Sequence, residues 1–314
     1  MAKQTKEKMS PAKKAALRRR SIPIYIMALP GLLYLFINNY MPMPGIILAF
    51  KNYKAKKGIY GSDWAGFKNF RYLFSTQDAF VITRNTICYN LAFIVINLVF
   101  AIMVAIILSE LTSRFKKLYQ SVILLPYLLS AVIISYLVYA FLSVENGFIN
   151  NSILKPLGME AISWYQEKKY WPFILVFVNL WKGIGYNCII YLSTILGFDR
   201  SYYEAAAIDG ATKWQQITKI TLPLLRPTVI MLTLMAVGRI FYSDFGLFYQ
   251  VPQNSGALFS VTNTIDTYVY RGLLELGDIT MSAAAGVYQS LVGFVLVLTA
   301  NLAVRKIDPD SSLF

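Results

Sequence analysis

Residues 201–223 read SYYEAAAIDGATKWQQITKITLP, a polar segment between two long apolar blocks. Ser201 and Glu204 stand three residues apart, which is the spacing of a capping box at the start of a helix. The alanines that follow favour continuation of this helix, and Gly210 can take the left-handed conformation in which helices commonly end. The pattern predicts a short helix that stops at Gly210.

A second helix is expected directly after the first. Thr212 and Gln215 form another capping box. Ile217 and Ile220 would give this second helix one apolar side, and Pro223 is expected to close the segment. The two short helices, set at an angle across the end of a helix bundle, would present the small residues 205–207 to the surface of another protein.

The composition of the 314-residue chain is that of a membrane protein. Hydrophobic residues make up 56% of the chain and charged residues only 15%, whereas ordinary soluble domains have about 25% charged residues. A formal net charge of +14 would suggest nucleic-acid binding in a soluble protein. In a membrane protein it marks orientation instead, so we expect no nucleic-acid partner.

Six apolar blocks are long enough to cross a bilayer, whose core of about 30 Å needs about 20 helical residues. Each block predicts one transmembrane helix. The first contains Pro30, Pro42 and Pro44 and is expected to kink near Pro30 and to break between residues 41 and 45. The blocks cover residues 21–50, 85–109, 118–144, 170–198, 227–251 and 279–304. The expected fold class is an all-α integral membrane protein with six transmembrane helices.

The distribution of basic residues suggests the orientation of these helices. Residues 1–20 contain eight Lys or Arg and one Glu, so this tail is expected in the cytosol. Six spans return the C-terminus to the cytosol, where Arg305 and Lys306 follow the last block. The loop 51–84 is an anomaly, because it would lie outside the cell and yet carries seven basic residues.

An interfacial helix near residues 63–74 could account for part of that loop. Trp64, Phe67, Phe70 and Phe74 recur at three- and four-residue steps, which would place their rings at the outer headgroup boundary. An ordinary amphipathic helix packed on the bundle explains the same spacing. The sequence leaves both interpretations open.

Several kinds of chemistry are excluded by the residues that are absent. The chain has no His and only two Cys, so it cannot form the usual zinc or haem sites or a Ser-His triad. Cys88 and Cys188 fall in apolar blocks and are interpreted as packing residues. The Gly-x4-Gly-Lys-Ser/Thr phosphate loop does not occur either, so this chain lacks that cradle for ATP hydrolysis.

The segment 201–223 resembles the cytoplasmic signature of permease subunits in binding-protein-dependent ATP-binding-cassette importers. Asp209 and Ala211 match the longer form of this signature that is common in sugar permeases, and Ile217 stands where Phe is frequent. The resemblance covers roughly residues 22–306 and is closest to permeases for oligosaccharides and polysaccharide fragments, by segments 238–250, 266–271 and 283–293. The positions in register with the core signature are Glu204, Ala205, Ala206, Gly210, Ile220, Leu222 and Pro223.

This resemblance implies a type I importer permease fold and a division of labour between subunits. The expected organisation is a basic tail (1–20) and a six-helix permease domain (21–314), with a coupling-helix loop at 199–225 that docks in a groove of an ATPase subunit. The implied partners are two ATPase subunits, a second permease (expected to be a different homologous chain), an extracytoplasmic solute-binding protein, the carbohydrate and membrane lipids. No cofactor is expected on this chain, since ATP and Mg would bind the ATPases. The implied location is the bacterial cell membrane, with both termini cytosolic.

Three ionisable residues interrupt the apolar blocks, namely Lys182, Arg239 and Asp244. Charge is costly inside a bilayer, so such residues usually face a partner, a watery cavity or a solute. Sugars are bound by hydrogen bonds to their hydroxyls and by stacking on aromatic rings. The candidate substrate path therefore consists of these three residues and their neighbours Tyr186, Asn187, Tyr242, Tyr249 and Gln250.

A structural role for the same charges is the alternative. Arg239 and Asp244 could satisfy one another or pair with a second permease, although five residues of helix place them about 140° apart. A basic pair formed by Lys182 and Arg239 would suit acidic sugars.

Two other classes of function compete with an ATP-driven importer. A secondary transporter driven by an ion gradient would show inverted repeats and acidic residues near the midplane, but the blocks contain only Asp244 and no obvious repeat. A membrane enzyme would need paired carboxylates or metal ligands, and the sequence offers no such constellation. We therefore expect a transport subunit without catalytic residues or a metal site.

Overall fold

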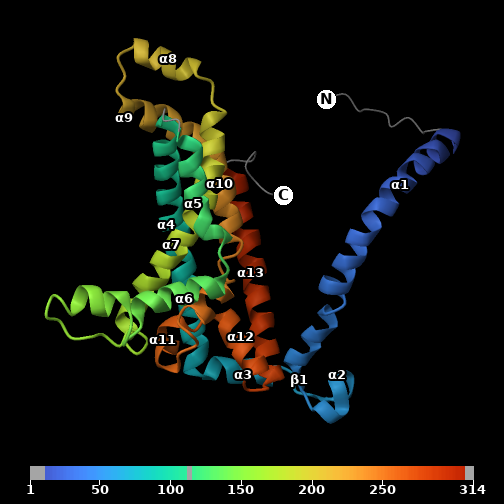
Figure 1. The fold of residues 1–314 in the computed structure, drawn as a ribbon. Coiled ribbons are helices and arrows are strands. Elements are labelled where there is room, and N and C mark those ends of the chain that lie inside the picture. Colours follow the sequence, from blue (N-terminus) through green and yellow to red (C-terminus); the bar gives the residue numbers. More distant parts are fainter. Residues whose placement is uncertain (1–10, 112–114, 308–314) are drawn as a thin grey trace.

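The computed structural model describes residues 11–111 and 115–307, so residues 1–10 of the expected basic tail and 308–314 of the expected permease domain lie outside it. Within these ranges the fold is helical, as expected, apart from one small antiparallel pair of strands (Figure 1). The longer helices are α1 (Pro11–Leu35), α4 (Gln77–Glu110), α5 (Lys116–Leu128), α6 (Ala131–Leu142), α7 (Trp171–Leu196), α10 (Leu222–Val237), α12 (Ile265–Leu274) and α13 (Ile279–Ile307).

Short elements connect the longer helices. They are η1 (Phe36–Tyr40), η2 (Met43–Phe50), β1 (Lys51–Asn52), η3 (Ala55–Lys57), α2 (Gly58–Gly61), β2 (Asp63–Trp64), α3 (Lys68–Ser75), η4 (Ile149–Leu154), η5 (Lys168–Tyr170), α8 (Ser201–Ile208), α9 (Lys213–Gln216), η6 (Ile217–Thr221), η7 (Gly246–Gln250), η8 (Gly256–Leu258) and α11 (Phe259–Thr262). Five helical stretches in the described residues are long and apolar enough to cross a membrane, or six if the bent pair α5–α6 counts as one span.

The bent pair corrects the expected single span over residues 118–144. Its two helices meet at an angle of 95°. Pro126 lies in the last turn of α5, and Ser130 caps α6 by accepting a hydrogen bond from the backbone N–H of Ile133. The proline and the new N-cap both favour an end to the first helix, so the chain turns sharply here.

The expected span over residues 227–251 is also wrong as a continuous helix. Helical structure already begins at Lys213 and runs through η6 into α10, which ends at Val237. Residues 238–244 are irregular and are followed by η7. The angle of about 140° that a continuous helix would place between Arg239 and Asp244 therefore does not apply.

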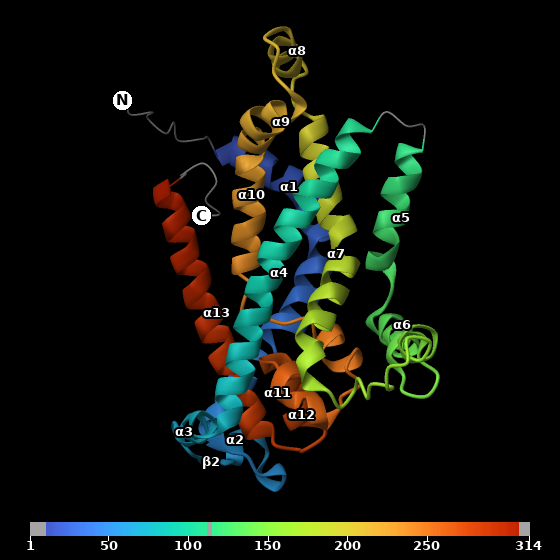
Figure 2. The ribbon, with the colours of Figure 1, turned by 90° about the vertical axis from the view of Figure 1, so that its left-hand side faces the viewer.

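The centre of the bundle lies between α4 and α7, which run side by side (Figure 2). Trp171 and Leu175 of α7 are fully buried in one cluster with Phe248 of η7. A second cluster nearer the α8 end includes Cys188, which is buried as expected. Cys88 is exposed on α4, so its expected packing role is wrong within this chain.

The first predicted span leaves the bundle. The stretch from Ser21 to Phe50 is helical apart from a break at Met41 and Pro42, inside the expected break. None of its most hydrophobic 18-residue window is buried, and α1 points away from the other helices (Figure 1). In the described part of the chain, this apolar window is not covered by the other helices.

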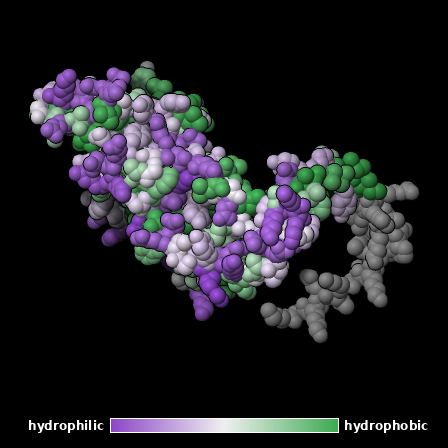
Figure 3. All heavy atoms as spheres, turned by 90° about the horizontal axis from the view of Figure 1, so that it is seen from below, coloured by the Kyte–Doolittle hydropathy of each residue, from purple (hydrophilic) through white to green (hydrophobic). Residues whose placement is uncertain are grey.

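The two ends of the bundle carry different elements. Helix α8 projects at one end, on the side where α1 begins and α13 finishes, whereas α3, α11 and α12 lie at the other (Figure 1). Viewed from that second end, hydrophilic side chains gather over the bundle, and hydrophobic ones are prominent on the arm that contains α1 (Figure 3). This separation of polar ends from apolar flanks is typical of a membrane protein.

The segment expected as an interfacial helix is shorter than predicted. Trp64 belongs to β2 and stacks on Phe50 with ring centroids 5.9 Å apart, and the turn at Gly66 (φ +56°) separates it from α3. Leu73 is buried, and the ring of Phe74 meets Tyr288 of α13 edge-on at 5.0 Å. The helix thus packs on the bundle, although Trp64 and Phe67 remain exposed.

Four of the seven basic residues in the loop 51–84 have polar partners. Lys54 and Lys57 both pair with Asp63, at 3.1 and 2.7 Å, and their hydrogen bonds hold the pKa of this carboxyl below its usual value. Lys51 donates to the carbonyl of Tyr60, and Arg84 donates to the carbonyl of Ser260. Much of the unexpected positive charge is therefore used inside the fold.

Candidate functional site

The projecting helix α8 begins differently from the sequence prediction. Ser201 does not cap it with its hydroxyl; instead the carboxylate of Asp199 accepts a hydrogen bond of 2.9 Å from the backbone N–H of Ser201. The same bond holds the pKa of the Asp199 carboxyl below its usual value. The predicted box of Ser201 and Glu204 is wrong because a carboxylate two residues earlier is available for the free amide at the helix start.

The end of α8 is the one that the sequence predicts. Gly210 has φ +76°. Its N–H donates to the carbonyl of Ala207, and the N–H of Ala211 donates to the carbonyl of Ala206. These two bonds around a left-handed residue form a Schellman motif, which fixes the direction in which the chain leaves the helix.

The second capping box is confirmed, but the second helix is not a separate unit. Thr212 accepts from the backbone of Gln215, whose side chain accepts from the backbone of Thr212. Helix α9 then continues through η6 into α10, so Pro223 stands in the first turn of α10 and does not close the segment.

Helix α8 stands almost free of the rest of the chain. None of its residues is buried, and Ile208 is 86% exposed. Trp214 of α9 is 71% exposed. The hydroxyls of Tyr203 and Thr221 lie 3.0 Å apart and connect α8 to η6. A large apolar side chain on a projecting helix is unusual on a water-exposed surface unless another protein covers it.

The irregular segment after α10 is held by side chains from three other helices. The amide of Asn90 donates to the carbonyls of Ile240 and Tyr242, at 2.9 and 3.0 Å. Gln289 donates to the carbonyl of Phe241. Asp266 accepts from both the backbone and the hydroxyl of Ser243. Non-helical backbone at this depth is tolerated because its polar groups are satisfied or line a cavity.

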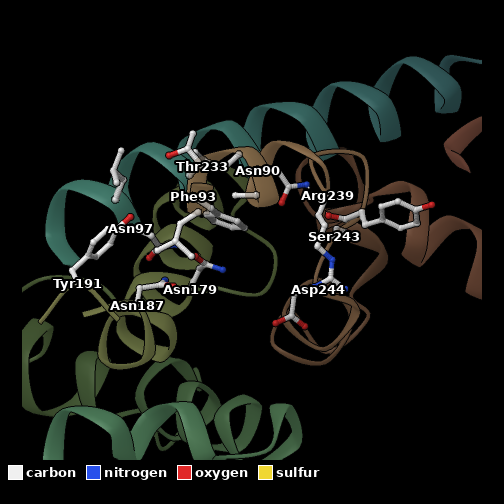
Figure 4. Close-up of a pocket in the computed structure, with 15 residues that line it drawn as sticks. Asn90, Phe93, Asn97, Asn179, Asn187, Tyr191, Thr233, Arg239, Ser243 and Asp244 are labelled. Carbon is white, nitrogen blue, oxygen red and sulfur yellow. Dashed lines mark hydrogen bonds between the residues drawn. The ribbon is translucent and has the colours of Figure 1, made fainter. Parts of the chain in front are cut away.

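A cavity of about 400 Å³ lies beside this segment, between α4, α7 and α10 (Figure 4). Its wall is rich in amides and other polar groups, which is unusual for the interior of an apolar bundle. The lining residues are Asn90, Phe93, Ile94, Asn97, Leu98, Asn179, Asn187, Tyr191, Leu232, Thr233, Ala236, Arg239, Tyr242, Ser243 and Asp244.

The cavity brings together half of the predicted path. Asn187, Arg239, Tyr242 and Asp244 line it. Lys182 reaches its edge, because its Nζ lies 3.2 Å from Oδ2 of Asp244.

The pairing of the charges corrects the sequence interpretation. Asp244 pairs with Lys182 and not with Arg239. Arg239 is exposed, without an ion pair or side-chain hydrogen bond among the residues that the structure describes. One unpaired cation therefore remains at the cavity wall.

Three predicted path residues lie away from the cavity lining. Tyr186 stacks on Tyr127 of α5, with ring centroids 4.8 Å apart. The hydroxyl of Tyr249 donates to Glu275, and its ring stacks on Phe245. Gln250 does not line the cavity either. The structure thus places these three residues outside the cavity that Arg239 and Asp244 line.

Sequence reasoning missed three asparagines of the cavity wall, Asn90, Asn97 and Asn179. A usable signal existed. Asn90 and Asn97 are seven residues apart in one apolar block, and Asn179 and Asn187 are eight apart in another. Spacings near two helical turns place each pair on one face, and amides inside a membrane span also need polar partners.

With this geometry established, comparison with known proteins identifies the family. The family model described as "Binding-protein-dependent transport system inner membrane component" matches residues 97–309. The chain belongs to this family. It is therefore a multi-pass membrane transport subunit of a binding-protein-dependent system, with the expected permease fold, and it is not an enzyme.

Curated relatives extend this similarity over almost the whole chain. Protein LplB of Bacillus subtilis (strain 168) is 33% identical over 94% of this chain and 92% of its own length. The polygalacturonan/rhamnogalacturonan transport system permease protein YteP of the same organism is 33% identical, over 91% of this chain and 89% of its own. Relatives of this kind favour the ATP-driven importer over a secondary transporter.

Two solved transporter structures contain chains that are similar to this one over more than nine tenths of its length. A chain from the crystal structure of a bacterial ABC transporter involved in the import of the acidic polysaccharide alginate matches with a TM-score of 0.85 and 30% identity, over 94% of this chain and 99% of that one. A chain from a bacterial alginate ABC transporter in complex with an alginate pentasaccharide-bound periplasmic protein matches with a TM-score of 0.82, 31% identity and coverages of 92% and 96%.

Proposed function

We propose that this permease carries oligosaccharides or glycan fragments into the cell, as part of an importer powered by separate ATPase subunits. The observation that carries this proposal is the match, over more than nine tenths of the chain, to a polygalacturonan/rhamnogalacturonan transport permease and to a transporter involved in alginate import. A cavity lined by amides, hydroxyls and one unpaired guanidinium suits a solute rich in hydroxyl groups.

The projecting helix α8 is proposed as the contact with an ATPase subunit. Its exposed Ile208 and the small residues Ala205 and Ala206 offer a surface on which another protein can pack closely. Glu204, Asp209, Gly210 and Ala211 shape this surface and its end. Ile220, Leu222 and Pro223 lie beyond it, where η6 enters α10, so they would transmit its movement to the bundle. ATP and Mg would bind the ATPase and not this chain.

The free helix α1 supports the proposal of a second permease. A groove of about 860 Å³ runs between η2 and α13, next to the base of α1. Its lining is mainly apolar and includes the small residues Ala283, Gly286 and Ser290 on one side of α13. Small residues allow close approach between membrane helices. A transmembrane helix of the second permease would cover both the groove and α1.

The orientation that we propose places α8 in the cytosol. The α8 end would then face the ATPases, together with both termini of the chain. The opposite end, with α3, α11 and α12, would face outward and receive the solute-binding protein. In this arrangement Trp64 and Phe67, which are exposed beside α3, lie at the outer headgroup boundary.

The path of the solute is proposed to run along the cavity. The solute would contact Asn187, Arg239, Tyr242 and Asp244 directly. Lys182 would balance the negative charge of Asp244 through their ion pair. Because Asp244 compensates Lys182, the path has one net positive charge from this chain, at Arg239. Tyr186, Tyr249 and Gln250 would act indirectly, through the packing around the cavity.

Reconstitution tests the proposal. The complete complex, with both permeases, the ATPases and the binding protein, is placed in lipid vesicles and offered labelled oligosaccharides, including alginate and polygalacturonan fragments and neutral arabino- and galacto-oligosaccharides. We expect uptake that requires both ATP and the binding protein. Uptake of any of these sugars by this chain alone, driven by an ion gradient without ATP, would contradict the proposal.

A further inference from the structure

We propose that Lys68 and Arg71, on the exposed face of α3, bind the phosphate group of an anionic phospholipid. They are two of the three basic residues in the loop 51–84 to which the fold gives no polar partner within the described chain. Helix α3 lies at the end of the bundle opposite α8 (Figures 1 and 2). In the proposed orientation, the phospholipid belongs to the outer leaflet, and its binding does not depend on which solute the permease carries.

The end of the first apolar span fixes the position of α3 relative to the bilayer. This span ends at Phe50, whose ring centroid lies 5.5 Å from that of Phe67, just before α3. The side chain of Asn69 donates hydrogen bonds of 2.9 and 3.0 Å to the carbonyls of Ala49 and Lys51. The first turn of α3 is therefore joined to the last residues of a membrane span, at the boundary between hydrocarbon and headgroups.

Lys68 and Arg71 present two unpaired cations at this depth. They are three residues apart in α3, so they project from the same side of the helix. Both side chains are exposed, and neither makes an ion pair or a hydrogen bond with a residue that the structure describes. The carboxylate of Asp63, in the same loop, is already paired with Lys54 and Lys57. Two neighbouring cations without a carboxylate are complementary in charge to a phosphate.

Exposed aromatic rings accompany the two cations. Trp64, Phe67 and Tyr72 are 69%, 72% and 62% exposed, although Leu73 on the other side of α3 is buried. Aromatic rings are enriched at the headgroup level of membranes, and basic side chains at that level are attracted to anionic lipids. The combination of rings and cations on one surface therefore favours a lipid over an acidic protein as the partner.

A bound phosphate would hold the first span at a fixed depth. The most hydrophobic part of this span is not covered by other helices of the described chain, so packing within the chain does not set its depth. The bonds from Asn69 to the end of the span connect it to α3. An anchor on α3 would therefore act directly on the span.

Quenching of Trp64 fluorescence by brominated lipid tests the site. The complete complex is placed in vesicles of one fixed mixture of phosphatidylcholine and phosphatidylglycerol. In parallel series, an equal amount of one or the other lipid carries bromine on its acyl chains. The chain has five Trp, so the contribution of Trp64 is obtained by subtracting the signal of a Trp64→Phe complex. The ratio of the two quenching constants gives the local preference for the anionic lipid.

We expect the wild type to prefer phosphatidylglycerol about fivefold or more at low salt, because each basic side chain near a membrane surface favours anionic lipid by about that factor. The double variant Lys68→Gln/Arg71→Gln should lower the ratio to about one. The exchange Lys68→Arg/Arg71→Lys keeps both charges and should retain the preference. High salt should weaken the wild-type preference, because exposed charges are screened.

Lys56→Gln is the matched control. Lys56 is an exposed cation between β1 and β2 that likewise lacks an ion pair in the described part of the loop, but it is not on α3. Its removal should leave the ratio unchanged. An equal loss in Lys56→Gln would overturn the site, because the total charge of the loop, and not α3, would then set the preference.

Two further outcomes would overturn the proposal. One is a wild-type ratio near one at low salt, a measurement that needs no substitution in α3. The other comes from the affinity of the complex for the solute-binding protein in vesicles of phosphatidylcholine alone. If the double variant weakened this affinity and kept the lipid preference, α3 would be a contact for the binding protein instead. Uptake is not measured, so failure of the lipid site is distinct from failure of the proposed function.

Discussion

Nζ of Lys182 lies 3.2 Å from Oδ2 of Asp244 and joins the middle of α7 to the irregular segment after α10. Asp244 lines the cavity, and its pairing with Lys182 leaves Arg239 as the uncompensated charge. Oδ1 of the same carboxylate accepts a hydrogen bond from the backbone N–H of Leu247, which fixes the start of η7. Asp244 thus balances the charge of Lys182 beside the cavity and also fixes the direction in which the chain enters η7.

Breaking this ion pair should affect stability only modestly. Lys182 and Asp244 have side chains that are 23% and 41% exposed, so solvent screens their attraction. A double-mutant cycle with Lys182→Gln and Asp244→Asn should give a coupling energy of about 0.5–1 kcal/mol, from denaturation of the assembled complex in detergent. A coupling energy indistinguishable from zero would show that the pair does not hold α7 to this segment.

The turn at the end of α8 should be sensitive to residue shape. Gly210 has φ +76°, so Gly210→Val should strain the turn by about 1–2 kcal/mol and change the direction of α8. We expect strongly reduced uptake and weaker co-purification of the ATPase. Gly210→Asn is the control, because asparagine tolerates left-handed backbone and should retain most activity. Equal activity of both variants would contradict this role of the turn.

The exposed isoleucine of α8 should matter for assembly and not for folding. Ile208 is 86% exposed, so Ile208→Glu costs this chain little, but would place a charge in a contact with the ATPase. We expect most of the co-purified ATPase to be lost at unchanged permease yield. Leu276→Glu is the control, since Leu276 is 79% exposed near the opposite end. Normal ATPase binding by Ile208→Glu would remove α8 from the interface.

Asn90 should contribute more to the stability of the complex and to solute binding than an exposed asparagine does. Asn90→Leu removes the donor that serves the carbonyls of Ile240 and Tyr242, and unpaired carbonyls of this kind cost about 1–3 kcal/mol. We expect a lower melting temperature of the complex and a higher KM. Asn151→Leu, which at an exposed position removes only bonds to the nearby carbonyls of Glu145 and Gly147, should change neither quantity. Equal melting temperatures for the two variants would refute this role.

The groove along α13 should report on the second permease. Gly286 lies in the groove, and an added Cβ there meets no atom within 4 Å. Gly286→Leu would fill the space proposed for a neighbouring transmembrane helix, so less second permease should co-purify. Gly286→Ala is the matched control and should assemble almost normally. Full assembly of the leucine variant would place the second permease elsewhere.

The sequence by itself determined the features that depend on local patterns. Apolar blocks of about 20 residues predict membrane helices because a bilayer imposes that length. Gly210 and the capping box of Thr212 with Gln215 predict the end of α8 and the start of α9, because helix caps depend on residues only a few positions apart. The signature around Glu204 indicated the family for the same reason, since all of its positions lie in one continuous segment.

Only the tertiary structure decided how distant segments meet. Asp244 pairs with Lys182, 62 residues away, and α10 ends at Val237 because Asn90, Asp266 and Gln289 satisfy the backbone that follows. Such contacts depend on the packing of helices against one another, and neither hydropathy nor helical periodicity specifies which polar side chains of different helices face each other.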